Sequence, residues 1–198
     1  MLQRLLSTTA LSAALTAAPT AFGAALIIDQ NQPSATTLIA HFSQTGLAQS
    51  FQQSQSNIAG AGIFLARTGS SSPITISLWD ALVGGASLAS GSALGTPGDW
   101  VDVFWTPVNV VPDHTYFLTF EPFTNDLVVA GDTEDLYPRG QAYANKGFGS
   151  FPKLDYSFRT FYAPNATTRS EVPEPGVLGL VAVSMLAFFR ATRSRSNA

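Results

Sequence analysis

Apolar and polar residues alternate along most of the chain, and this period of two predicts β-strands. In the segment 74–79, Ile74, Ile76 and Leu78 share one face, and Trp79 lies on the other. The first three are expected in a core, and Trp79 is expected under a loop or on an open face. Strands are predicted at residues 38–42, 48–52, 58–67, 74–79, 86–90, 100–104, 115–122, 127–131 and 156–162.

The pattern of the body predicts an all-β fold. No window between the two chain ends has a helical period, and Gly, Pro, Ser, Asn and Asp bound the strands. Short strands at this close spacing predict a single antiparallel β-sandwich of the jelly-roll type over residues 24–162. A polar linker is expected over residues 163–171. Helices are predicted only in the flanking segments, as an N-terminal signal helix and a C-terminal apolar helix.

Both chain ends have the features of targeting segments. Residues 1–23 combine Gln3 and Arg4, an alanine-rich apolar stretch and small residues at positions 21 and 23, which predicts a signal peptide removed by signal peptidase. Near the other end, an apolar run of 14 residues (176–189) precedes three arginines. Spanning a bilayer takes about 20 residues, so a short transmembrane helix that holds the protein only transiently is expected. The arginines favour the cytoplasmic side, which places the body outside.

The C-terminal residues 172–198 resemble the PEP-CTERM sorting signal of Gram-negative bacteria that make exopolysaccharide. The likeness consists of a sorting motif, an apolar helix with Gly179 inside it, and a basic end that is more widely spaced than the family's arginine block. The resemblance implies recognition by a membrane-embedded exosortase, then delivery to the cell surface or extracellular matrix. An ordinary C-terminal anchor after a Pro-rich stalk is the alternative. The motif is Val172-Pro173-Glu174-Pro175, and the basic residues are Arg190, Arg193 and Arg195.

Charge and cysteine content exclude several classes of partner and chemistry. Residues 24–171 contain 6 basic and 12 acidic residues, a net charge of 6 − 12 = −6. An acidic body repels phosphate backbones, so nucleic acid is not expected as a partner. The chain has no cysteine, which excludes disulfides, thiol chemistry and zinc–thiolate sites.

Residues for catalysis or metal binding are few. His41 and His114 lie far apart in the sequence and outside any recognised catalytic motif, so no catalytic set can be assembled and a non-enzyme is expected. The strongest acidic group is an oxygen-rich segment of the kind that Ca²⁺ prefers, although its spacing matches no EF-hand. A solvated acidic turn is the alternative, and no other cofactor is expected. The four carboxylates are Asp126, Asp132, Glu134 and Asp135.

Aromatic residues provide the candidate ligand-binding site. The glycine-rich segment 136–152 is predicted to be a long loop in which aromatic rings lie beside amide and guanidinium donors. Sugars are bound by such groups, because rings stack on apolar sugar faces while directed hydrogen bonds hold the hydroxyls. The alternative is that these rings close one end of the core. The candidate residues are Trp79, Tyr137, Arg139, Tyr143 and Asn145.

Residues 48–120 are similar to extracellular β-sandwich modules of the carbohydrate-binding type, in which a Pro-Gly-x-x-Tyr turn leads into a late strand. Here Pro112-Asp113-His114-Thr115-Tyr116 occupies the turn, with Asp113 in place of Gly. Asp can adopt the left-handed conformation that the turn requires.

Together these features predict an exported surface or matrix protein whose non-catalytic sandwich binds exopolysaccharide. A structural or adhesive component without a sugar site is the alternative. A polysaccharide-active enzyme and an ice-binding protein are further alternatives, although regular Thr-x-Thr ladders are absent.

Overall fold

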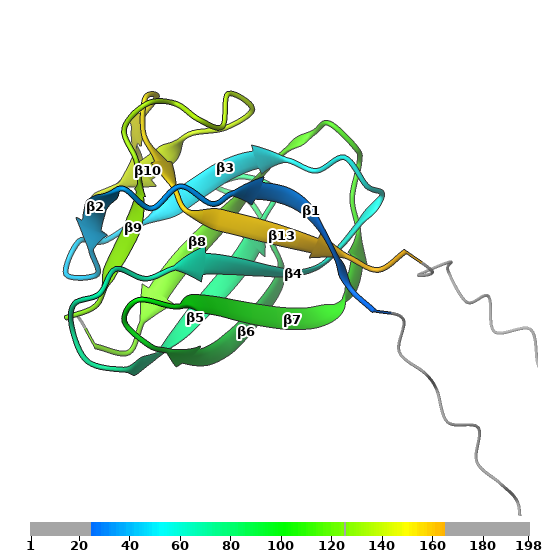
Figure 1. The fold of residues 1–198 in the computed structure, drawn as a ribbon. Coiled ribbons are helices and arrows are strands. Elements are labelled where there is room, and N and C mark those ends of the chain that lie inside the picture. Colours follow the sequence, from blue (N-terminus) through cyan, green and yellow to red (C-terminus); the bar gives the residue numbers. More distant parts are fainter. Residues whose placement is uncertain (1–24, 125, 165–198) are drawn as a thin grey trace, which may run out of the picture.

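The computed structural model of the protein describes residues 25–124 and 126–164, and this part of the chain is all-β. It contains no helix, and its strands pair antiparallel in three sheets with a β-sandwich-like arrangement (Figure 1). The prediction of an all-β fold is confirmed. The predicted signal peptide, the sorting motif, both predicted helices and the linker beyond Pro164 lie outside the described residues.

The two larger sheets pack on each other as two layers, and the three-stranded sheet covers one end of the sandwich (Figure 1). The four-stranded sheet has the order β1 (Ile27–Gln32), β13 (Phe158–Tyr162), β4 (Asn57–Phe64) and β7 (Trp100–Asn109). The six-stranded sheet behind it has the order β11 (Gly149–Phe151), β10 (Ala142–Ala144), β3 (Ala48–Gln52), β8 (Thr115–Pro122), β5 (Ser72–Trp79) and β6 (Ser87–Gly95). The three-stranded sheet has the order β12 (Asp155–Tyr156), β9 (Val128–Asp132) and β2 (Thr37–His41).

The hydrophobic core lies between the two larger sheets. Ile74, Ile76 and Leu78 of β5 are fully buried, as the alternation predicts. Across the core, Phe51 of β3 contacts Phe158 of β13, with their ring centroids 6.1 Å apart. Along β5, residues buried in the core therefore alternate with residues on the outer face of the sheet, whereas β4 and β9 are buried along almost their whole length.

Several strand limits differ from the predictions. The strand predicted at 58–67 ends at Phe64, whereas those predicted at 86–90 and 100–104 continue to Gly95 and Asn109. The strand predicted at 156–162 is divided at Ser157 into β12 and β13. There the Ser157 N–H donates to Ala130 of β9 while its carbonyl accepts from Phe64 of β4, so one residue joins two sheets.

The prediction of a long loop at 136–152 is wrong in part, because β10 and β11 form a hairpin within it. Strand β1 was not predicted either. Its segment Ile27–Gln32 contains buried Gln30 and Gln32, which hydrogen bonds compensate, so it lacks an apolar alternation.

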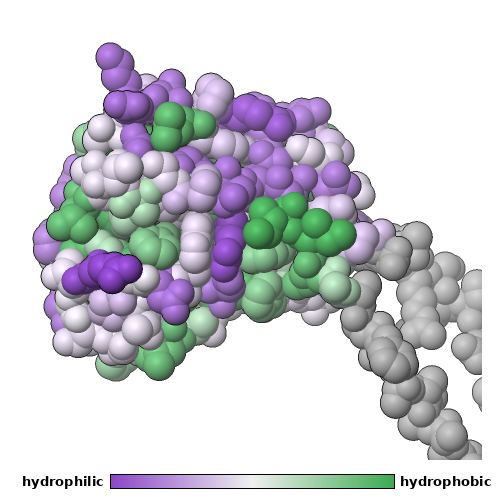
Figure 2. Space-filling model, in the orientation of Figure 1, coloured by the Kyte–Doolittle hydropathy of each residue, from purple (hydrophilic) through white to green (hydrophobic). Residues whose placement is uncertain are grey.

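The outer face of the four-stranded sheet combines polar and apolar surface (Figure 2). Gly62 of β4 leaves space that Asp102 of β7 fills, and Asp102 forms an ion pair with Arg159 of β13 across it. The Arg159 guanidinium lies 4.2 Å from the centroid of the Trp100 ring. Phe104, further along β7, is 54% exposed. Aromatic rings thus occupy this face, although none of them was predicted as a ligand site.

Candidate ligand-binding face

Three partly exposed aromatic side chains form a band on the outer face of the six-stranded sheet. Phe117 of β8 lies directly opposite Trp79 of β5 in the strand register. Its ring also contacts Tyr143 of β10 edge-on, with centroids 5.8 Å apart and an angle of 69°. Neighbouring residues such as Leu118 and Ala142 point into the core, so Trp79, Phe117 and Tyr143 point outward. We call these three residues the aromatic band.

Hydrogen bonds fix the rings at both ends of the aromatic band. The Trp79 indole Nε1–H donates to Thr119 Oγ1 at 3.0 Å, and the Gln141 amide donates to the Tyr143 hydroxyl at 2.9 Å. The backbone N–H of Gln141 donates to Ser50 Oγ at 2.9 Å, which holds this residue against β3. The rings are therefore held in place before any ligand arrives, which reduces the entropy lost on binding.

Hydroxyl groups extend the same face beyond the rings. Ser77 and Thr75 alternate outward along β5 from Trp79, and the hydroxyls of Thr75 and Ser92 lie 2.7 Å apart. Glu121 of β8 pairs with Thr75 in the register and is exposed. The face therefore offers apolar rings beside hydrogen-bond donors and acceptors.

Arg139 lies at the edge of the same face. Its Nε donates to Gln52 Oε1 at 3.2 Å, and Gln52 pairs with Thr115, two residues before Phe117. The Arg139 guanidinium also forms an ion pair with Asp113. Asp113 has a φ of 62°, as predicted for this turn residue. The ion pair neutralises the charge of Arg139, which leaves its remaining N–H groups as directed donors.

Tyr137 is not part of this surface. It is buried in the core, where its ring meets Phe158 edge-on at 5.0 Å and its hydroxyl donates to Gln30 Oε1 at 2.7 Å. Burial raises the pKa of Tyr137 from its ordinary value of 10.0 to about 12. The prediction that Tyr137 offers a ring to a ligand is thus corrected, because both its face and its hydroxyl are occupied by the core. Asn145 lies exposed in the β10–β11 turn, with a φ of 69°.

Phe117 was missed by the sequence-based prediction. Its strand alternates with Tyr116, Leu118 and Phe120 facing inward, so the same alternation that located Trp79 also places Phe117 on the outer face. The three residues of the band come from segments 26 or more positions apart, and the sheet order that unites them is not visible in the pattern.

The four acidic candidates for metal binding are not brought together. Asp126 precedes β9 and Asp132 ends it, and a strand of five residues spans about 16 Å. Glu134 and Asp135 are exposed in the turn that follows Asp132. Among the described residues, no group of three His, Cys, Asp or Glu side chains has a metal-binding arrangement.

Local hydrogen bonds account for the acidic residues at both ends of β9. The Asp132 carboxylate accepts from the hydroxyls of Ser34 and Thr36 at 2.6 and 2.8 Å, and these bonds lower its pKa. At the other end, Thr124 and Ser70 donate to Asp126 and likewise lower its pKa. Both carboxylates therefore act as caps for neighbouring loops.

Comparisons with protein-family models, curated proteins and solved structures produce no match for this chain. Among the residues that the structure describes, no helical segment has the length and apolar character needed to span a membrane.

Proposed function

We propose that the protein is a non-catalytic module that binds glycan through the aromatic band. The observation that supports this most is the row of Trp79, Phe117 and Tyr143 across one open sheet face, bordered by hydroxyl and amide groups. Aromatic rings contribute large contact area, and nearby polar groups give the orientation that sugar hydroxyls need. The fold is proposed to be a jelly-roll variant of the sandwich.

The surroundings of the band favour a neutral polymer over an anionic one. Arg139 is paired with Asp113, and Glu121 adds negative charge to the face. An acidic body with a net charge of −6 over residues 24–171 repels polyanions at low salt. We therefore propose neutral exopolysaccharide as the ligand.

Export is proposed on the basis of the chain ends. The signal peptide, the Pro173-Glu174-Pro175 element and the terminal arginines support secretion, recognition by exosortase and delivery to the surface or matrix of a Gram-negative bacterium. Replacement of Glu174 by Ala should leave the tail unprocessed in a host that has an exosortase, and the change would be seen as a higher mass in the membrane fraction. Unchanged processing and release would contradict sorting through this motif.

The band can be tested with a matched pair of aromatic substitutions in the full chain. Trp79→Ala should weaken binding to neutral polysaccharides about threefold to tenfold, because a stacked ring contributes roughly 0.5–1.5 kcal/mol. Phe104→Ala removes an exposed ring from the opposite sheet and should leave affinity unchanged. Affinity is measured by isothermal calorimetry after screening on a glycan array. Equal effects of both substitutions, or no binding to any glycan, would refute the proposal.

A structural or adhesive role is the second candidate. It is favoured by apolar side chains on the four-stranded sheet, where Ile28, which is 42% exposed, pairs with Phe161, and the Phe161 ring contacts the exposed Phe104. Exposed apolar patches often mark protein contacts. Self-association that Phe104→Ala abolishes, together with the absence of glycan binding, would favour this role.

A further inference from the structure

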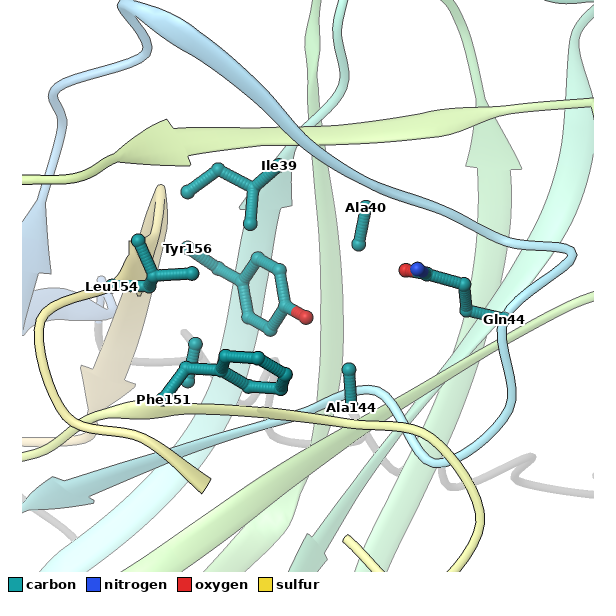
Figure 3. A pocket seen from close by; sticks show the side chains of 8 residues that line it. Ile39, Ala40, Gln44, Ala144, Phe151, Leu154 and Tyr156 are labelled. Atoms are coloured by element: carbon teal, nitrogen blue, oxygen red, sulfur yellow. The ribbon is translucent and has the colours of Figure 1, made fainter. Parts of the chain in front are cut away.

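A small apolar cavity lies at the end of the sandwich that the three-stranded sheet closes, behind the β10–β11 hairpin (Figure 3). Its volume is about 110 Å³. It is separate from the aromatic band, because Ala142 and Ala144 face the cavity while Tyr143, between them on β10, faces the band. Its lining residues are Ile39, Ala40, Gln44, Ala142, Ala144, Phe151, Leu154 and Tyr156.

Three alanines leave this space open. Ala40 of β2 and Ala142 and Ala144 of β10 are all buried, and each presents only a methyl group to the cavity. Larger side chains at these positions would fill the space, as they do in close-packed cores. The opening reaches the surface beside Gln44, which is exposed, and Phe151, which is 37% exposed on the short edge strand β11.

The lining favours an apolar occupant over water. A buried water needs about two to four polar partners, and apolar cavities remain dry. The Tyr156 hydroxyl already donates to the Tyr143 carbonyl at 3.1 Å. Among the lining residues, this leaves the Gln44 amide as the side chain that can both donate and accept hydrogen bonds, and Figure 3 shows it directed toward the cavity.

We propose that this cavity binds a short acyl chain whose carbonyl group meets Gln44. A water molecule takes about 30 Å³ of liquid, so the cavity holds about four groups of that size, which corresponds to a butyryl group. The acyl chain contacts the Phe151 side chain and the methyl groups of Ala40 and Ala144, in front of the fully buried Ala142, and the amide of Gln44 donates to its carbonyl oxygen. The chain could belong to a free small amphiphile or to an acyl ester on a polysaccharide.

Alanine methyl groups report directly on occupancy. The full chain, labelled with ¹³C at alanine methyls, is titrated with butyramide, and the Ala40, Ala142 and Ala144 signals should shift saturably with a dissociation constant in the millimolar range. Alanines elsewhere in the chain serve as internal controls. Unchanged signals for these three residues at 100 mM butyramide (about 100 times the expected constant) would overturn the proposal.

Two variants and a polymer pair complete the test. Ala144→Leu fills the cavity and should abolish the shifts, whereas Gln44→Leu, at the exposed mouth, keeps the fold and should weaken binding about tenfold. Equal affinity in Gln44→Leu and the wild type would refute the role of the amide. Stronger binding of butyrylated dextran than of unmodified dextran indicates an ester-linked acyl group, and equal binding indicates a free amphiphile. Trp79→Ala should not change butyramide affinity, so this test does not depend on the proposed glycan site.

Discussion

Replacement of Tyr137 by Phe tests whether this residue belongs to the core, as the structure shows. The change removes one hydroxyl that donates to Gln30 Oε1 at 2.7 Å and accepts from the Gln52 backbone N–H at 3.3 Å. Gln30 is buried, so its carbonyl loses a partner that water replaces poorly. A buried polar group left without its partner costs about 1–3 kcal/mol, and we expect a loss of this size in the free energy of unfolding.

The loss is measured by urea unfolding at pH 7, with Tyr143→Phe as the matched control. The Tyr143 hydroxyl accepts from Gln141 on the partly exposed face, where water can replace the bond, so this variant should lose less than about 0.5 kcal/mol. On heating, a loss of about 2 kcal/mol should lower Tm by about 4–8 °C for a domain of this size. Equal stability of Tyr137→Phe and the wild type would refute the buried hydrogen-bond network.

The comparison of Tyr137→Phe with the wild type also has a pH signature. The pKa of Tyr137 is raised in the folded protein from 10.0 to about 12, so the unfolded chain loses this proton first. The associated stability is complete below pH 10 and is lost as the pH rises to about 12. Tyr137→Phe should therefore lose less stability than the wild type across this interval. An identical alkaline decline in both proteins would contradict the burial of the hydroxyl.

Three further changes test other parts of the fold, all by chemical unfolding. Gly62→Ala places a Cβ against the Asp102 carboxylate, so it should displace the ion pair and cost about 1–3 kcal/mol; unchanged stability would show that the pair moves freely. Arg159→Lys keeps the charge but loses the two parallel hydrogen bonds to Asp102, and it should lower the free energy of unfolding by about 1 kcal/mol. In high salt, this loss should be smaller than the loss caused by Gly62→Ala. Because the pKa of Asp132 is lowered in the folded protein, its carboxylate stabilises the fold at pH values above the ordinary pKa of 3.8. This contribution is lost as the pH falls through the pKa of the folded state. The stability difference between Asp132→Asn and the wild type should therefore shrink below pH 4, and a constant difference would exclude the ionised carboxylate as its source.

The alternation of apolar and polar residues predicted those strands whose two faces differ in polarity. In β5 and β8, buried aliphatic residues alternate with outward Thr, Ser and aromatic residues, so both strands were predicted. Strand β1 was not, because its buried Gln30 and Gln32 have the hydropathy of surface residues. Hydrogen bonds to residues far along the chain compensate their burial, and no local pattern contains such partners.

The residues of the candidate site were likewise predicted only in part. Trp79 and Tyr143 were identified from the sequence, and the structure places both on one face. Tyr137 stands six positions from Tyr143 in a segment of similar composition, yet it is buried. Part of the difference comes from Gln30, which is 107 positions away in the sequence and accepts a hydrogen bond from the Tyr137 hydroxyl. Local composition cannot separate a ring that closes a core from one that faces solvent, because the distinction depends on such long-range contacts.

The central position of β13 in its sheet has a mechanical consequence. This last strand of the described chain lies between β1 and β4 and is hydrogen-bonded to both. Inter-strand hydrogen bonds run perpendicular to the strands, so a pull on the C-terminal end of β13, along its axis, loads both ladders in shear and strains many bonds at once. Tension applied beyond Pro164 would thus enter the sheet through a strand that is hydrogen-bonded on both sides. A pull between the two ends of the domain would instead peel Ile27 from Tyr162 first, one bond at a time. The four-stranded sheet should therefore resist a pull on the C-terminal end of β13 along its axis better than a pull that draws the two ends of the domain apart.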